Sequence, residues 1–511
     1  MTGSRWPTCR LFLICAAAAM VSSGMMNMNL SSVNIPHAVL QDFVNASYYK
    51  HYNEYFSDSG MKTLWGFIVS CPSLISIFGA QLVHPLTEYL GRKWTVFVAM
   101  GLLNCTAALL MALSKIVESW EMYLAGRLVL GVSLGLSASV LSIYISECSP
   151  PSQRALLSAC LAAAASLCSW VAYLISLPQF LGTADHWHYM YFVMAGLCIV
   201  LMLPVMVVPE SPKYSLLKKG KEMEARKTVE GLYGVSWDVE VIVRSFQTEG
   251  KQAQSTEAAK AVTFRDLFTQ RHLRKGLLIG TMALFTRAVC GLSLLRSYSA
   301  ETLQKVLGDS SDSEAIANYV TLASFGPPVF LTMLAAIAGE RLGRRVVLLG
   351  ALTGMTVCHV IFVIFSQLSN HHPEVKWPGY IAVASQFLNV QIFNLGVTPA
   401  CFLLLAEIVP QAARSKALSL SSSIYFLLFY FILQIFPILD NAIGSYSFLV
   451  LCVIPTTAIV IYLFREMPEP KGKSVDEIVA KWLHAKPKSD EPSLGYTNTM
   501  FNSSSTTVEK F

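Results

Sequence analysis

The stretch Glu147-Cys-Ser-Pro150-Pro-Ser-Gln-Arg154 follows a long apolar run and recurs 260 residues later as Glu407-Ile-Val-Pro410-Gln-Ala-Ala-Arg414. In both copies a proline comes three residues after the glutamate, and an arginine comes seven residues after it. A second motif, Glu88-Tyr-Leu-Gly91-Arg92-Lys93, recurs 252 residues later as Glu340-Arg-Leu-Gly343-Arg344-Arg345. Because the two offsets nearly agree, the chain consists of one unit written twice.

The composition is that of a polytopic membrane protein. Of the 511 residues, 54% are hydrophobic and only 14% are charged, whereas soluble proteins carry about 25% charged residues. The net charge of +6 comes from basic residues between apolar runs, so no nucleic-acid partner is expected. None of the twelve cysteines falls in a predicted outer loop, so no disulfide framework is expected. We found no catalytic, nucleotide or metal motif, and we expect neither an enzyme nor a cofactor.

Apolar runs of about 20 residues, the length that a hydrocarbon core of ~30 Å requires, predict twelve spans. The first covers Leu11 to Pro36 and is predicted to stay uncleaved. The others are predicted to begin near Leu64, Trp94, Met122, Ala155, Tyr189, Gly276, Asn318, Val346, Tyr380, Ala417 and Tyr446. We therefore predict an all-α membrane protein with two pseudo-symmetric six-helix bundles, residues 1–208 and 273–466. A cytoplasmic helical loop would lie between them (209–272), and a mostly disordered cytoplasmic tail would follow (467–511).

The distribution of basic residues predicts the orientation in the membrane. The short loops after spans 2, 4, 8 and 10 carry most of the loop arginines, which places these loops and both termini in the cytosol. The expected location is the plasma membrane. Among the sequons, only Asn45, with Ser47, lies in a predicted outer loop, so Asn45 is the expected glycosylation site.

The repeated charged motifs are predicted to close the cytoplasmic side. Carboxylates and guanidiniums at span ends can form charge-assisted bonds that hold one conformation shut. The alternative is that these charges only anchor the topology. The predicted gate residues are Glu88, Arg92, Glu147, Arg154, Glu340, Arg344, Glu407 and Arg414.

The loop from Glu210 to His272 is predicted to be helical. Pro212 to Leu232 has the pattern of a basic amphipathic helix, and its predicted apolar contacts are Leu216, Leu217, Met223, Val229 and Leu232. A second, weaker helix follows, and Phe264 to Phe268 leads back to the membrane. The alternative is a solvated linker between the two halves.

Several motifs resemble the sugar porters of the major facilitator superfamily, most closely the facilitative glucose transporters. Arg127-x3-Gly131-x3-Gly135, followed by Tyr144-x2-Glu147-x2-Pro150-x3-Arg154, resembles the signature of the branch. Pro209-Glu-Ser-Pro212 and Pro468-Glu469-Pro-Lys471-Gly472 are similar to its loop and tail motifs, and Asn34-x-Pro36 is similar to the glucose transporters. The resemblance covers about residues 10 to 480. It implies two bundles that rock about a central sugar site, driven only by the substrate gradient.

The resemblance weakens at the positions that would face the sugar. Where the family has paired glutamines and an asparagine in span 7, this chain has Arg287, Ala288 and Ser293, although Tyr298 is retained. Other substitutions at such positions are Ala162, Pro328, Asn394, Phe402, Tyr425 and Phe426. Because hexose recognition depends on donors and acceptors paired with hydroxyls, a glucose site would be weakened. The substrate-binding candidates are Arg287, Ser293, Tyr298, Asn394, Phe402, Tyr425 and Asn29.

The spans offer little for coupling to protons. The span 1 position that carries Asp in proton-coupled sugar porters is Asn29, and no Asp or Glu lies inside any predicted span. His359 is the one histidine well inside a span, and it is interpreted as a helix contact rather than a proton carrier. Facilitated diffusion is therefore expected.

Arg287 is the unusual charge of the sequence. It lies 11 residues into predicted span 7, about 16 Å along the helix axis and near the membrane midplane. An arginine at that depth must face water, backbone carbonyls or a ligand. Arg296 is expected to reach the outer interface.

Three functions stay open from the sequence. The first is a facilitative transporter of a hexose or related polyol. The second is a uniporter of a small organic anion that uses Arg127 and Arg287. The third is a non-transporting sugar sensor. The partners would be a small solute and the lipid bilayer, and the oligomeric state is open.

Overall fold

The computed structural model describes residues 7–137, 139–150, 153–234, 237–258, 264–308, 311–332, 334, 343–372, 374–397, 408–409 and 411–467. All of the regular elements in these ranges are helices. Within the described ranges, ten helical stretches are long and apolar enough to cross a membrane, and Trp187–Met202 is a shorter apolar helix. The remaining predicted span, near Asn318, corresponds to α18 (Ser311–Phe325) and lies partly outside the described residues.

The N-terminal half contains the first six spans. Span 1 is α1 (Cys9–Ala19), a π-helical turn η1 (Met20–Gly24) and α2 (Met25–Ser31) in continuous succession. Spans 2 and 3 are α4 (Asp58–Gln81) and α7 (Met100–Val117), the latter preceded by α6 (Arg92–Trp94) and η2 (Thr95–Ala99). Spans 4 to 6 are α8 (Trp120–Ser137) with α9 (Val140–Cys148), then α10 (Arg154–Ile175) and α11 (Trp187–Met202).

The C-terminal half repeats this plan. Span 7 is divided into α16 (Arg271–Val289) and α17 (Leu292–Leu307), and α18 belongs to span 8. Spans 9 and 10 are α20 (Arg344–His371) and α21 (Trp377–Ile392) with η4 (Phe393–Val397). Span 11 is α23 (Gln411–Ile443), and span 12 is α24 (Tyr446–Phe448), η5 (Leu449–Val453) and α25 (Ile454–Glu466). Most helices begin a few residues before the predicted apolar runs, because polar residues supply their first turns.

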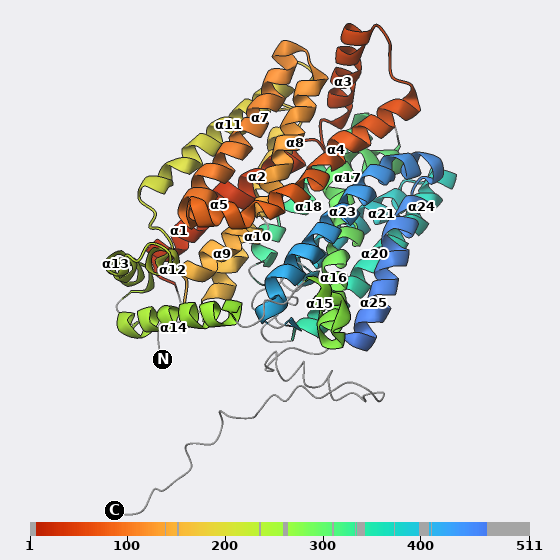
Figure 1. Ribbon diagram of the computed structural model, residues 1–511. Coiled ribbons are helices and arrows are strands. Elements are labelled where there is room, and N and C mark those ends of the chain that lie inside the picture. Colours follow the sequence, from red (N-terminus) through yellow and green to blue (C-terminus); the bar gives the residue numbers. More distant parts are fainter. Residues whose placement is uncertain are drawn as a thin grey trace, which may run out of the picture.

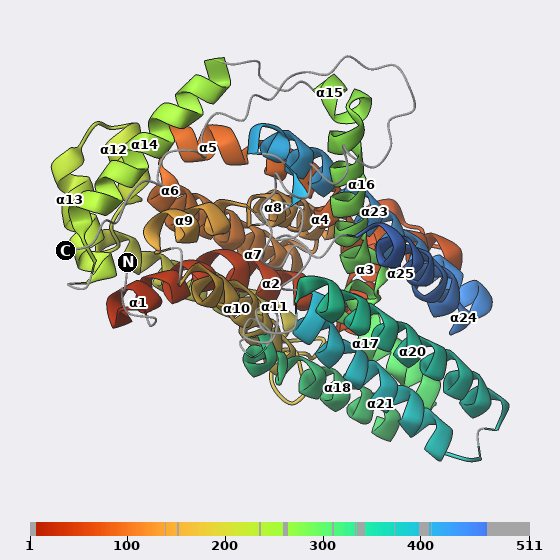
Figure 2. The same cartoon turned by 90° about the horizontal axis from the view of Figure 1, so that it is seen from below.

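The two halves lie side by side, with the loop helices at one end (Figure 1). These are α12 (Pro212–Leu217), α13 (Glu222–Tyr233) and α14 (Val239–Ala258), which cover the end of the N-terminal half. We call this end the loop-helix face. The opposite end carries α3 (His37–Tyr52), and we call it the α3 face. Viewed from below, α12 to α14 lie beside α5 (Val83–Tyr89), α6 and α9, away from α20 and α21 (Figure 2).

The prediction of one continuous helix from Pro212 to Leu232 is wrong. The chain turns at Gly220, whose φ of +64° favours glycine, and this turn separates α12 from α13. The break changes the helical phase, so Leu217 and Met223 are exposed rather than packed. Leu216, Val229 and Leu232 are buried as predicted. The predicted second helix is α14, and Phe264–Thr269 forms α15, which leads into span 7.

Candidate functional site

Span 7 breaks at Gly291, in the middle of the C-terminal half. Gly291 has a φ of +83°, and a Cβ there would lie 2.4 Å from Nε2 of His359. A residue with a side chain would therefore be both strained and obstructed. The break gives α16 and α17 separate ends, so α17 can take a direction of its own.

His359 stabilises this break. Its Nε2 lies 2.9 Å from the carbonyl oxygen of Cys290, the C-cap of α16, and its Nδ1 lies 3.5 Å from the amide nitrogen of Gln386. A carbonyl only accepts and an amide NH2 only donates, so these contacts fit a neutral ring that carries its proton on Nε2. The contacts agree with the interpretation of His359 as a helix contact.

Arg287 lies next to the break, in the last turn of α16. Its guanidinium is half-buried, lies 5.8 Å from the centre of the Phe393 ring, and hydrogen-bonds with the Tyr425 hydroxyl. Asn394, beside Phe393 in η4, is buried and donates its amide to the carbonyl of Val390 at 2.8 Å. The structure thus brings Arg287, Tyr425 and the η4 turn of span 10 together.

The expectation that Arg296 reaches the outer interface is wrong. Its guanidinium points inward and donates to Oδ1 of Asn27 in span 1 at 2.5 Å. The Arg296 carbonyl accepts from the Tyr173 hydroxyl of α10 at 2.9 Å. Arg296 thus lies where α17 contacts the N-terminal half.

Three other predicted substrate residues are engaged in packing. Tyr298 is buried, donates its hydroxyl to the carbonyl of Leu433 at 3.2 Å, and packs against the ring of Phe436. Ser293 is buried in the first turn of α17. The amide of Asn29 donates to Met25 in its own helix, and its Oδ1 is buried without a partner among the described residues. Phe402 lies outside the described residues.

Arg127 cannot supply charge to a solute, because its guanidinium is completely buried among backbone carbonyls. It donates to Ile68 and Val69 of α4 at 3.1 Å each, and to Asn29 of α2 at 3.4 Å. Pro72 has no N–H, so the carbonyl of Ile68, four residues earlier, loses its helical donor. Arg127 replaces that donor.

The rest of the Arg127-x3-Gly131-x3-Gly135 motif extends the same contact. A Cβ on Gly131 would lie 2.7 Å from the carbonyl oxygen of Pro72, and one on Gly135 would lie 2.2 Å from that of Ser76. The motif repeats every four residues and so lies along one face of α8, against residues of equal spacing on α4. It joins spans 2 and 4 closely.

On the α3 face the two halves are joined by hydrogen bonds to α17. The Asn34 amide donates to the carbonyl of Arg296 at 3.0 Å and to the hydroxyl of Ser299 at 2.9 Å, and Asn34 accepts from the backbone N–H of Ala300 at 3.1 Å. Further bonds between the halves join Ser70 to Gln434 and Gln179 to Tyr319. Among the described residues, the hydrogen bond from Gln81 to Ser419 is the one between the halves that lies towards the loop-helix face.

The helices of spans 7 and 11 continue past the predicted apolar runs. Helices α17 and α23 extend far enough to include Glu301 and Asp440 near the α3 face. Lys305 pairs with both, at 2.9 Å and 2.7 Å, and Ser447 donates to Asp440. The pair with Asp440 joins the end of α17 to α23.

On the loop-helix face, Arg92 and Glu147 form a half-buried ion pair. Arg92 Nε lies 3.1 Å from Glu147 Oε2, and Arg92 Nη2 lies 3.2 Å from Oε1. The Ser211 hydroxyl donates to the same carboxylate, and the Arg92 guanidinium stacks over the Tyr214 ring at 4.6 Å. Next to it, the backbone N–H of Lys93 donates to Glu210 at 2.9 Å. This cluster connects spans 3 and 4 to α12, within one half.

The structure describes the side chains of only some of the other predicted gate residues. Glu88 pairs with Lys218 at 2.5 Å, and this hydrogen bond lowers the pKa of the Glu88 carboxyl. Arg154 donates to the carbonyl of Ser149 at 3.3 Å. Glu340 and Glu407 lie outside the described residues, as do the side chains of Arg344 and Arg414. Asn45 lies half-exposed on α3, and its side-chain oxygen accepts from the backbone N–H of Phe56.

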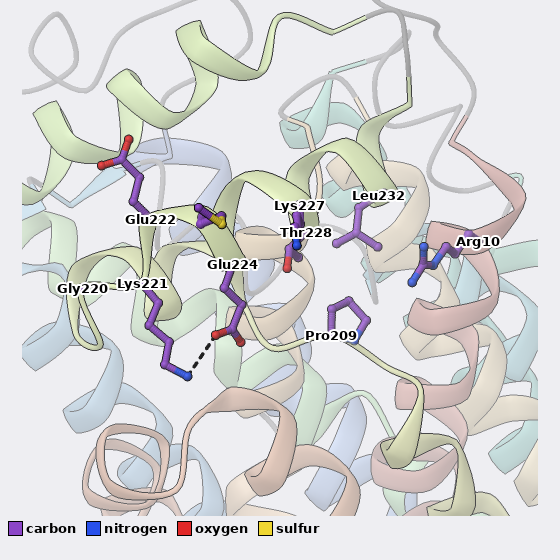
Figure 3. Close-up of a pocket in the computed structure, with 11 residues that line it drawn as sticks. Arg10, Pro209, Gly220, Lys221, Glu222, Glu224, Lys227, Thr228 and Leu232 are labelled. Carbon is purple, nitrogen blue, oxygen red and sulfur yellow. Dashed lines mark ion pairs between the residues drawn. The ribbon is translucent and has the colours of Figure 1, made fainter.

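A separate cavity of about 700 Å³ lies on the loop-helix face, between α13 and Arg10 at the start of span 1 (Figure 3). Its lining mixes charges of both signs, and Lys221 pairs with Glu224 at 3.1 Å. Thr8 donates to the carbonyl of Leu232 and so ties the chain before span 1 to α13. The cavity belongs to the packing of the loop helices, away from span 7.

The fold is that of the major facilitator transporters. It matches a partially occluded inward-open conformation of the xylose transporter XylE from E. coli with a TM-score of 0.72 at 18% identity, covering 91% of this chain and 100% of that one. It matches the proton:xylose symporter XylE bound to 6-bromo-6-deoxy-D-glucose equally well, at 19% identity, covering 93% and 99%.

Sequence comparison gives the family. Residues 14–482 match the family model "Sugar (and other) transporter", and the chain belongs to this family of transporters, which are not enzymes. It is 30% identical to human facilitated glucose transporter member 7 of solute carrier family 2, covering 92% of this chain and 89% of that protein. It is 28% identical to human member 5, covering 92% of each.

Proposed function

We propose that the chain is a facilitative carrier that moves a sugar-class solute across the membrane by alternating access. The observation that carries this proposal is the distribution of bonds between the two halves. They are concentrated on the α3 face, where Asn34, Tyr173 and Gln434 hold the halves together. A carrier closed on one side and able to rearrange on the other has this asymmetry.

The divided span 7 supports the same mechanism. Helix α17 bears most of the bonds that close the α3 face, and the break at Gly291 separates it from α16. Release of the Asn34 contacts would let α17 move away from the N-terminal half. The residues at the break, Arg287 and Tyr425, then face solute from either side in turn.

The carrier works by facilitated diffusion. Asn29 stands where proton-coupled sugar porters have an acid, and His359 is held in a neutral form by its two contacts. Glu301 and Asp440 are already neutralised by Lys305 near the α3 face. None of these groups offers a proton site that alternates between the two sides.

We place the loop-helix face and both termini in the cytosol, and the protein in the plasma membrane. The excess of arginine in the short loops at this face supports the assignment. The conformation is then inward-facing, since the closed α3 face lies outside. Asn45 on α3 would carry the glycan.

Trans-stimulation in proteoliposomes tests the carrier. Purified protein is reconstituted in vesicles preloaded with unlabelled sugars, and entry of the same labelled sugar is followed. A carrier exchanges solute faster than it moves empty, so preloading should accelerate entry of at least one sugar. A folded protein that shows no saturable entry with any sugar or sugar acid would contradict the carrier function.

A further inference from the structure

Arg296 brings a second positive charge to the centre of the carrier. We infer that the central site takes a small organic anion of sugar size, a sugar acid, rather than a neutral hexose. The inference rests on the proposed carrier function and adds the charge of the solute. Its basis is the placement of Arg287 and Arg296 on either side of the break in span 7.

Among the described residues, the contacts of Arg296 offer its charge no carboxylate partner. Its Nη1 donates to Oδ1 of Asn27, which is a neutral amide. The Asn27 amide nitrogen in turn donates to the carbonyl of Ser23, so Asn27 is held by its own helix. The Nε of Arg296 is buried without a hydrogen-bond partner among the described residues. A guanidinium has five N–H donors, and one neutral acceptor satisfies few of them.

The charged groups near Arg296 do not neutralise it either. Arg296 forms no ion pair among the described residues, and the Tyr173 hydroxyl bonds to its backbone carbonyl rather than to its guanidinium. Helices α17 and α23 carry the carboxylates of Glu301 and Asp440, and both of these pair with Lys305. An anion bound between two guanidiniums is attracted to both, and this attraction offsets their mutual repulsion.

Tyr425 marks where such an anion would bind. Its hydroxyl accepts a hydrogen bond from the Arg287 guanidinium, so its own proton can be donated to an anion bound beside Arg287. Both arginines remain half-buried rather than enclosed, although they lie in the middle of the protein. A carboxylate fits guanidinium donors well, because both are planar and can pair through two hydrogen bonds.

The helix ends at the break favour the same charge. The C-terminal end of α16 carries partial negative charge, but the Nε2–H of His359 donates to its last carbonyl at Cys290. Helix α17 begins at Leu292 without a side-chain cap, so its N-terminal end keeps its partial positive charge. The positive end of α17 thus lies in the same segment as the two arginines.

D-glucuronate and D-glucose test the inference as a matched pair, because they differ in a carboxylate at C6. The purified full chain is reconstituted in proteoliposomes, and the membrane potential is set with a potassium gradient and valinomycin. We expect saturable glucuronate entry that is faster when the inside is positive. Glucose entry, if any, should not respond to the potential.

Arg296→Gln tests the residue itself. Glutamine can still donate to Asn27, but it has no charge, so glucuronate entry should fall by roughly 30-fold or more. Arg296→Lys should retain part of the entry, because it keeps the charge. Arg274→Gln is the control, since Arg274 is an exposed arginine in the first turn of α16. This control should behave like the wild type.

Two results would overturn the inference and leave the carrier function intact. One is glucuronate entry that survives Arg296→Gln. The other is a wild type that carries glucose, ignores the potential and does not carry glucuronate. The response to potential needs no variant, so the inference stays testable even if Arg296→Gln fails to fold. Absence of saturable entry for every sugar and sugar acid would overturn the carrier function as well.

Discussion

The Nε of Arg127 lies 3.1 Å from the carbonyl oxygen of Ile68, the residue whose helical donor position is occupied by Pro72. A side chain of span 4 thereby completes the backbone hydrogen bonding of span 2. The guanidinium is structural, which removes Arg127 from the set of charges available to a solute. Arg287 and Arg296 remain as the charges at the centre of the protein.

Loss of this contact should destabilise the fold. In Arg127→Met, the carbonyl of Ile68 would lose its donor in an apolar setting, at a cost of about 1–3 kcal/mol. The melting temperature of the detergent-purified protein should fall. Pro72→Ala restores an N–H to the helix, so the double variant should lose less stability than the sum of the two single variants. Strict additivity would show that Arg127 does not substitute for the missing donor.

The Arg92–Glu147 pair is expected to hold α12 against the N-terminal half. Cys148 lies completely buried beside it and can report on its opening. In a Cys9→Ser background, Arg92→Ala should accelerate alkylation of Cys148 by an impermeant maleimide applied from the loop-helix face. Lys93→Ala is the control, because Lys93 contributes its backbone N–H to Glu210, and the substitution keeps that group. Equal alkylation in all three proteins would leave these charges as topology anchors.

Asn34 is expected to set the balance between the two conformations. Asn34→Ala removes the bonds to Arg296, Ser299 and Ala300, and should favour the outward-open state by about 1–3 kcal/mol. A cysteine at Ser299, buried in the closed form, should then react faster with a reagent added from the α3 face. Gln41→Ala, which removes a half-exposed amide on α3, should leave the reaction unchanged. Slow labelling of the Asn34 variant would mean that other contacts close this face.

The stability that the Glu88–Lys218 pair contributes should decrease as the pH falls. The hydrogen bond from Lys218 lowers the pKa of Glu88 from 4.5. A depressed carboxyl pKa contributes stability above the unfolded value, and this contribution is lost as the pH falls through the folded value. Wild type should therefore melt at a higher temperature than Glu88→Gln above pH 4.5, and the difference should vanish in more acid solution. A difference that is constant with pH would exclude this origin.

The sequence was sufficient for the fold because hydrophobic runs and repeated motifs depend on local pattern. The duplication around Glu147 and Glu407 and the spans between charged turns needed no tertiary information. Arg296 was misplaced because its position was extrapolated along a straight helix. The signal for the break was present in Gly291, but only the positive φ and the His359 ring beside it show that the helix stops there.

The sequence indicated which residues belong to the site, but not which atoms they contact. Arg287 and Tyr425 were selected from departures at family positions, and the structure brings them together. Tyr298 was selected in the same way, yet its hydroxyl bonds to the backbone of Leu433. Pro72 was a readable sign of an unpaired carbonyl, but its donor lies two spans away at Arg127. Such contacts depend on packing between helices, which no local pattern encodes.

The energetics of transport test the central claim most directly. Valinomycin and equal potassium concentrations on both sides of the membrane hold the proteoliposomes at zero potential. Uptake of labelled glucuronate and glucose is then followed to completion, with and without a proton gradient. Facilitated diffusion predicts that the internal concentration of each transported solute rises to the external one, stops there and does not respond to a protonophore. Accumulation above the external concentration that a protonophore abolishes would contradict the account.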